Sequence, residues 1–157
     1  LPVLRKDFTV SLRDVYDARA MGADAVLLIA AVLDDAELAA LSVAARACDM
    51  SVLVEVHDEK EVLRALDQGA SMIGVNQRDL HTFEVDSARA VALATSIPSS
   101  VLKVAESGIA GAKDVALLAA AGYDAVLVGE ALVSSTDPAA AVASLSAAAS
   151  KAAFPCG

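Results

Sequence analysis

The most regular feature of the sequence is a series of six short apolar segments, separated by longer stretches with helical periodicity. The segments are rich in Val, Leu and Ile, are nearly continuous rather than alternating, and are bounded by turn residues. This pattern is typical of parallel strands that are buried on both faces of a sheet. The predicted strands cover residues 3–4, 25–29, 52–56, 72–75, 101–104 and 125–128.

The stretches between the predicted strands carry start and stop signals of α-helices. Small polar residues stand at N-cap positions, and Glu61 follows Asp58 at the spacing of a capping box. Glycines at 22, 69 and 122 stand where three of the helices end. The predicted starts are Ser11, Asp34, Asp58, Asp86 for a shorter helix through Val91, Asp114 in a first turn, and Asp137 followed by Pro138.

Strict alternation of strands and helices predicts an α/β fold with a parallel sheet and outer helices. Residues 22–27, 69–73 and 122–127 repeat one helix-to-strand pattern, which favours a repetitive barrel over an irregular sheet. No linker or charge run divides residues 1–157, so we predict a single domain.

The amino-acid composition and net charge of the chain exclude several classes of protein. A hydrophobic content of 57% excludes intrinsic disorder. A net charge of −9 argues against nucleic acid as a partner, although local donors can still bind a small anionic substrate. No apolar run approaches the roughly 20 residues that cross a bilayer, so no membrane is expected. Cys48 and Cys156 have no metal or redox spacing, and we expect free thiols in a reducing cytoplasm.

Polar residues follow five of the predicted strands, at the ends where α/β proteins bind ligands. They are Lys6 after the first, Glu55 and His57 at the third, Asn76 and Arg78 after the fourth, Glu106, Ser107 and Gly108 after the fifth, and Gly129 and Glu130 after the sixth. Several polar groups at the ends of apolar strands are costly unless they converge on one site.

Structural alternatives stay open for most of these residues. They are a Lys6 paired only with Asp7, a Glu55 that pairs with a neighbouring cation, a His57 that caps the next helix, an Asn76 that forms a turn, and an Arg78 paired with Asp79 or Glu84. The pair of glycine turns at 107–108 and 129–130 predicts a phosphate site, because backbone amides there can approach an anion. No dinucleotide fingerprint or metal-ligand cluster is present, so no cofactor or metal is predicted.

Five motifs in order resemble those of the indole-3-glycerol phosphate synthase family. They are residues 4–8 (LRKDF), 53–57 (LVEVH), 73–80 (IGVNQRDL), 105–109 (AESGI) and 128–132 (VGEAL). The resemblance implies a (β/α)8 TIM barrel of tryptophan biosynthesis. Such a lyase closes the indole ring of 1-(2-carboxyphenylamino)-1-deoxyribulose 5-phosphate and releases carbon dioxide and water.

The resemblance also implies roles for individual residues. Lys6 matches the general acid and Glu55 the catalytic base. The residues matching the substrate site are Phe8 in the apolar wall, Asn76 and Glu106 beside the reacting hydroxyls, Arg78, and Ser107, Gly108, Gly129 and the Glu130 amide at the phosphate. Some family members have Ser where this chain has Glu130, so its carboxylate is expected to point away from the phosphate.

The chain resembles only part of the family's barrel. About six β-α units are present, corresponding to strands 3 to 8, and the first two units with their glutamate and lysine are lacking. We therefore expect weak activity from residues 1–157 alone, and either self-association or dependence on the missing N-terminal segment. The alternatives are a non-catalytic phosphate-binding piece and a related phosphoribosyl isomerase-type barrel, whose usual acidic or cysteine residues do not match Lys6 and Glu55.

Overall fold

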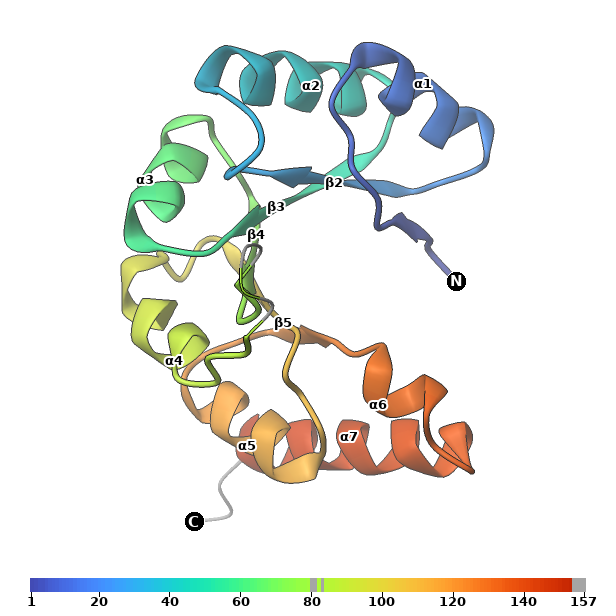
Figure 1. Cartoon of the computed structure of the whole chain (residues 1–157), viewed down its shortest axis with the longest axis vertical. Coiled ribbons are helices and arrows are strands. Elements are labelled where there is room, and N and C mark those ends of the chain that lie inside the picture. The colour runs from blue at the N-terminus through green and yellow to red at the C-terminus, as the bar shows by residue number, and fades with distance from the viewer. Residues whose placement is uncertain (80–81, 83, 154–157) are drawn as a thin grey trace. The chain divides into compact units, whose positions relative to one another are not determined.

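The computed structural model describes residues 1–79, 82 and 84–153, in which strands and helices alternate (Figure 1). The strands are β1 (Leu4–Arg5), β2 (Ala25–Ile29), β3 (Ser51–Val56), β4 (Met72–Asn76), β5 (Leu102–Glu106) and β6 (Ala125–Leu127). The helices are α1 (Leu12–Ala20), α2 (Asp35–Ala47), α3 (Glu59–Asp67), α4 (Arg89–Leu93), the 3₁₀ turn η1 (Ala94–Ser96), α5 (Ala112–Ala120), α6 (Glu130–Val133) and α7 (Pro138–Ala153).

The chain divides into two compact units, residues 1–74 and residues 75–157. In the first unit β1, β2 and β3 pair in parallel and in chain order. The register places Arg5 opposite Val26 and Ile29 opposite Glu55, so the positions of Arg5 and Glu55, at and near the ends of β1 and β3, are set by pairing with β2. The helices α1 and α2 lie side by side next to β2 (Figure 1).

In the second unit β5 and β6 pair in parallel, with Glu106 opposite Leu127. The helices α5 and α7 lie side by side (Figure 1). The buried Tyr123 hydroxyl, just before β6, donates to the Ala90 carbonyl in α4 at 2.7 Å, and burial raises the pKa of this phenol. This bond ties the start of β6 to α4.

The repeated helix-to-strand pattern has a structural counterpart in both units. Asp24 Oδ2 accepts the backbone N–H of Val3 at 2.7 Å, and Asp124 Oδ2 accepts that of Lys103 at 2.9 Å. In each unit an aspartate two residues after the helix-ending glycine therefore fastens the preceding strand. The glycines at 22 and 122 have φ of +88° and +91°, a conformation that side chains disfavour.

Most predicted helix starts are confirmed. The N-cap side chains of Ser11, Asp34 and Asp58 accept backbone N–H groups of α1, α2 and α3, and Asp137 accepts the N–H of Ala140 in α7. Asp114 lies in the first turn of α5.

The predicted start at Asp86 is wrong. The Asp86 side chain accepts the N–H of Ala88 at 3.0 Å, two residues on, which closes a turn. Helix α4 begins only at Arg89 and ends at Leu93 rather than Val91. The short helix α6, which starts at Glu130 directly after Gly129, is absent from the sequence-based prediction because four residues carry no periodic signal.

Candidate active site

The first predicted pair, Lys6 and Glu55, is in contact. Lys6 lies directly after β1, and its Nζ donates to Glu55 Oε2 near the end of β3 at 3.1 Å. The Glu55 side chain is 2% exposed, whereas that of Lys6 is 44% exposed. The unit thus holds a buried carboxylate beside a solvent-accessible ammonium, which suits proton transfer to and from a ligand.

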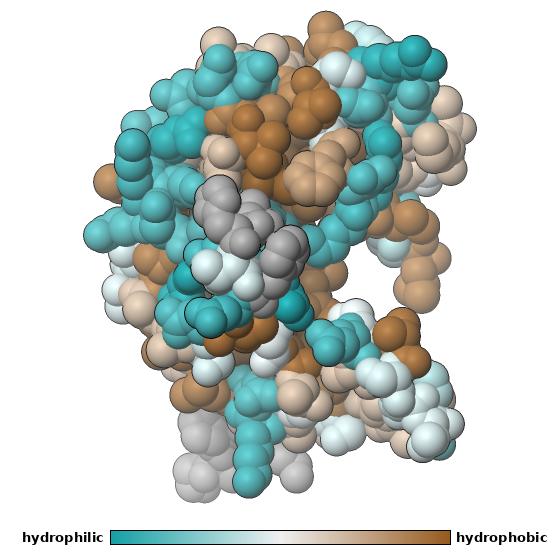
Figure 2. All heavy atoms as spheres, in the orientation of Figure 1, coloured by the Kyte–Doolittle hydropathy of each residue, from teal (hydrophilic) through white to brown (hydrophobic). Residues whose placement is uncertain are grey.

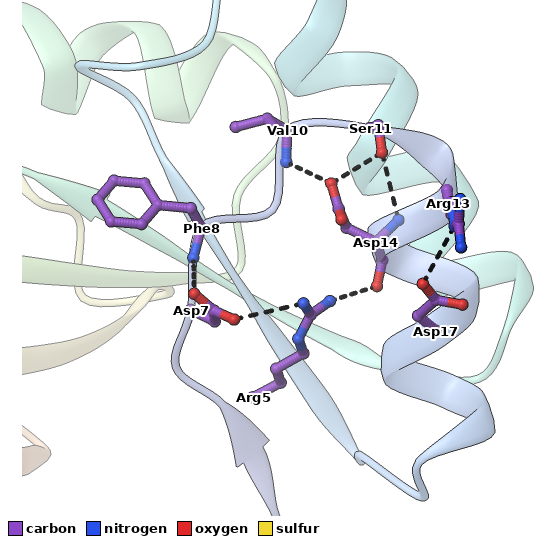
Figure 3. Close-up of polar contacts among 8 residues, drawn as sticks. All are labelled: Arg5, Asp7, Phe8, Val10, Ser11, Arg13, Asp14 and Asp17. Carbon is purple, nitrogen blue, oxygen red and sulfur yellow. Dashed lines mark hydrogen bonds and ion pairs between the residues drawn. The ribbon is translucent and has the colours of Figure 1, made fainter.

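The loop from β1 to α1, which carries Lys6, is braced by Arg5 (Figure 3). Arg5 donates to the Asp14 carbonyl at 2.6 Å and pairs with Asp7 Oδ2 at 3.4 Å. Asp7 Oδ1 accepts the N–H of Phe8 at 2.8 Å. The Phe8 ring points away from α1, as Figure 3 shows, and is exposed. Asp7 is thus engaged by Arg5 and by the backbone.

The same loop is fixed at its other end by Asp14. Its Oδ2 accepts the Ser11 hydroxyl at 2.8 Å and the Val10 N–H at 3.1 Å (Figure 3). These bonds, that from Ser11 above all, hold the pKa of the Asp14 carboxyl below its ordinary value. Because this pKa is depressed in the folded chain, the stabilisation is present near neutral pH and is lost as the pH falls through the carboxyl range.

His57 lies one residue beyond β3, on the side of Glu55 as expected. Its Nε2 is 3.6 Å from Glu55 Oε1, and its Nδ1 is 3.2 Å from Glu61 Oε2 in α3. The His57 backbone N–H also donates to Glu61 Oε2, at 2.7 Å. Glu61 therefore closes back on His57 rather than on the N-cap Asp58, whose side chain accepts the Glu61 N–H.

In the second unit Asn76 is the last residue of β4, and Arg78 lies two residues beyond it. Asn76 Oδ1 accepts the Arg78 N–H at 3.0 Å, so this side chain closes the turn that was one of its two predicted roles. Arg78 pairs with Glu130 Oε2 at 3.2 Å, a partner that the sequence did not suggest. The Glu130 carboxylate is largely exposed and is directed to this guanidinium.

The turn after β5 is supported by a residue that sequence analysis missed. Gln77 is buried; its side chain donates to the Ser107 carbonyl at 2.8 Å and its backbone N–H to the Glu106 carbonyl at 3.0 Å. Glu106 is also buried, at the end of β5. The one sequence signal for Gln77 was an amide directly after an apolar strand, where a buried polar group needs a partner.

Both residues of this turn have left-handed backbone. Ser107 has φ +63° and Gly108 φ +66°. The left-handed backbone at Ser107 costs on the order of 1 kcal/mol. Residues strained in this way are concentrated at functional sites in proteins. A Cβ on Gly108 would collide with Cγ1 of Val85, so glycine is required here for space as well as for φ.

The two predicted phosphate turns leave the same edge of the second unit. Glu106 and Leu127 are register partners, so the residues that follow β5 and β6 emerge next to each other. Gly129 lies two residues beyond Leu127 and precedes Glu130. The pairing of β5 with β6 therefore brings the two sequence-predicted turns to one edge of the sheet.

Among residues 1–79, 82 and 84–153, no three His, Cys, Asp or Glu side chains form a group able to hold a metal ion. In the same residues no helix is long and apolar enough to cross a membrane. Cys48 is a free cysteine, and Cys156 lies outside the described residues.

Residues 1–145 match the family model for indole-3-glycerol phosphate synthase. The chain belongs to the indole-3-glycerol phosphate synthase family. It is 54% identical over 145 residues to the indole-3-glycerol phosphate synthase of Parafrankia sp., covering 92% of this chain and 54% of that protein. The synthase of Mycolicibacterium smegmatis is 53% identical over 145 residues, again 92% of this chain and 53% of its own length. The chain thus spans about half the length of these curated relatives.

Solved structures confirm the fold. The 3-hexulose-6-phosphate synthase of Salmonella typhimurium superposes with a TM-score of 0.82 at 20% identity, covering 96% of this chain and 74% of that one. Thiamine phosphate pyrophosphorylase of Pyrococcus furiosus superposes with a TM-score of 0.73 at 16% identity, covering 98% and 84%. This indole-3-glycerol phosphate synthase family member therefore has the partial (β/α)8 TIM-barrel fold that its sequence predicts.

Proposed function

We propose that the chain supplies the acid-base pair and the phosphate site of an indole-3-glycerol phosphate synthase. The observation that carries this proposal is the Lys6–Glu55 contact at 3.1 Å, in a chain whose residues 1–145 match that family. The substrate is then 1-(2-carboxyphenylamino)-1-deoxyribulose 5-phosphate, and the reaction is the ring closure of tryptophan biosynthesis. A cytoplasmic location is part of the proposal, and the free Cys48 supports it.

The two side chains fit the two proton transfers of this reaction. Condensation of an arene carbon onto a ketone needs an acid at the carbonyl oxygen, and the later loss of water needs a base. Lys6 is exposed enough to reach the substrate oxygen, whereas the buried Glu55 is fixed in one place. Orientation of the substrate against these groups contributes a further part of the rate. Phe8 is exposed and lies two residues after Lys6. The proposal places its side chain beside the aromatic ring of the substrate.

We propose that the substrate phosphate binds at the backbone amides of residues 107–108 and 129–130. The adjacent exits of β5 and β6 and the left-handed backbone at Ser107 and Gly108 support this position. Asn76, Arg78 and Glu106 then contact the remainder of the substrate. The Glu130 carboxylate pairs with Arg78, which supports an arrangement in which only the backbone amide of Glu130 binds the phosphate.

Gly108→Ala is expected to weaken the binding of inorganic phosphate about tenfold or more. The added methyl collides with Val85 and opposes φ +66°, so the turn has to move. Gly122→Ala in the same unit is the matched control, since its φ is +91° and its Cβ would meet only Lys103 Nζ at 3.9 Å. Isothermal titration with phosphate measures both variants. Equal affinities in the two variants would contradict the proposed phosphate position.

We further propose that the chain acts with additional barrel strands, from an N-terminal segment or from a second copy. β1 and β6 stand at the two ends of the strand order, and edges of this kind accept further strands. Hydrophobic residues also reach the surface around β1 and α1 (Figure 2). They are Leu1, Val3, Phe8, Val10, Leu12, Tyr16 and Met21.

The experiment compares residues 1–157 with a fused barrel, in which the first two β-α units of the Mycolicibacterium smegmatis relative precede this chain. We expect formation of indole-3-glycerol phosphate by the fused barrel and little by the chain alone, which light scattering would find associated. A fused barrel that binds phosphate but never forms indole-3-glycerol phosphate would favour the alternative that this chain is a non-catalytic phosphate-binding piece. A monomeric chain as active as the fused barrel would contradict the need for added strands.

A further inference from the structure

The His57 imidazole lies between two carboxylates of the first unit. Nδ1 is 3.2 Å from Glu61 Oε2 and Nε2 is 3.6 Å from Glu55 Oε1. The His57 side chain is 12% exposed, so the ring sits among protein atoms rather than in solvent. The His57 ring therefore lies between Glu61 of α3 and the Glu55 carboxylate. The other oxygen of that carboxylate, Oε2, accepts from Lys6 Nζ.

The two ring nitrogens are held very differently. The Glu61 oxygen that faces Nδ1 also accepts the His57 backbone N–H at 2.7 Å, which fixes the ring on that side. Nε2 is buried and has no hydrogen-bond partner among the described residues. At 3.6 Å from Glu55 Oε1 it is just beyond hydrogen-bond distance, a separation that catalytic contacts close when substrate binds.

The anchoring of the ring does not by itself require histidine. The backbone bond to Glu61 is independent of the side chain, and a shorter side chain with one donor would serve at the Nδ1 position. What the imidazole adds is a second nitrogen, aimed at Glu55. A carboxylate is an acceptor only, so Nε2 complements Oε1 when it carries a proton. Because Nδ1 already faces the Glu61 carboxylate, both ring nitrogens donate together only in the doubly protonated imidazolium.

We propose that His57 is a positioning residue for Glu55: anchored by Glu61, it holds Oε1 through Nε2, so that Oε2 faces Lys6. This inference rests on the proposed function, in which Glu55 is the base. When substrate binding closes the 3.6 Å contact, the carboxylate is held on both oxygens and cannot rotate away from the reacting atoms, and small misplacements of such groups are costly to the rate. The charged groups in contact with this arrangement include Lys6, at Glu55 Oε2, and Glu61, at His57 Nδ1; the N-cap Asp58 accepts the Glu61 N–H.

Two variants separate the two nitrogens. His57→Asn places an amide donor near the Nδ1 position and keeps the contact with Glu61, whereas His57→Gln reaches the Nε2 position and the contact with Glu55. In the fused barrel we expect kcat to fall about tenfold in His57→Asn, with KM little changed, and to stay within about threefold of the parent in His57→Gln. Glu61→Ala, which frees the ring without touching Glu55, is expected to lower kcat in the same way as His57→Asn.

A second measurement needs no activity. The carboxyl carbon of Glu55, assigned with Glu55→Gln, is followed by NMR in the fused barrel with bound indole-3-glycerol phosphate as the pH is varied. Loss of a donor should move its titration to higher pH in His57→Asn, and less in His57→Gln. Identical kcat values or identical titrations in the two variants would overturn the proposal. A parent protein without synthase activity would instead refute the proposed function, while the titrations still test the His57–Glu55 contact.

Discussion

Lys6→Met and Glu55→Gln should each lower kcat of the fused barrel about 100-fold or more, with KM changed only a few-fold. General acid and base groups contribute rate factors of about 10² to 10⁴, because they act on charge that develops in the transition state. Each variant keeps the approximate shape of the side chain and removes the group that exchanges a proton. Substrate binding through the phosphate turns lies in the second unit and should be largely spared.

Steady-state assays of indole-3-glycerol phosphate formation measure both variants. Lys60→Met is the matched control, because Lys60 is an exposed lysine of α3 outside the candidate site. We expect its kcat to equal that of the parent. A loss below a few-fold in Lys6→Met or Glu55→Gln would refute the assignment of that residue. A large rise in KM at constant kcat would instead make the pair a binding contact.

The strands and helices could be predicted because their signals are local. Continuous apolar runs and cap residues lie within a few positions of one another, so Ser11, Asp34 and Asp58 were each found at the correct helix start. The helix start predicted at Asp86 was wrong because the local signal there is ambiguous. An aspartate can bind the N–H two or three residues on, and the residues around it do not decide between a turn and a helix.

The candidate site could be predicted only in part. Strand order is enough to bring Lys6 and Glu55 to one end of parallel strands, although 49 positions separate them. It does not select partners among long side chains: Arg78 contacts Glu130, 52 positions away, a partner that was not named beforehand. The supporting role of Gln77 depends on backbone carbonyls, which have no sequence signature.

Arg64 supports the stability of the first unit, and its removal should have the largest effect on folding. From α3 its three guanidinium nitrogens bind Asp35 Oδ1 at the start of α2, at 2.7 Å, and the Ala30 and Leu33 carbonyls of the loop between β2 and α2, at 2.8 Å and 2.7 Å. Ala30 also donates its N–H to the Glu55 carbonyl at 3.0 Å. The guanidinium thus fastens a loop that is hydrogen-bonded, through Ala30, to the backbone of Glu55 in β3.

Arg64→Ala is expected to lower the free energy of unfolding by about 2–4 kcal/mol. Ala30 and Leu33 are buried, and a buried acceptor that loses its donor costs about 1–3 kcal/mol. Arg64→Lys should restore less than half of the loss, since an ammonium cannot reach three acceptors in fork geometry. Urea unfolding followed by circular dichroism gives both values.

Arg13→Ala is the matched control for this prediction. Arg13 forms one ion pair with Asp17 at 3.5 Å, and its side chain is 88% exposed. Exposed pairs of this kind contribute about 0–1 kcal/mol, so the loss should stay in that range. Similar losses in Arg64→Ala and Arg13→Ala would mean that water satisfies the two carbonyls as well as the guanidinium does. In that case the loop beside Glu55 would be held by α2 packing rather than by Arg64.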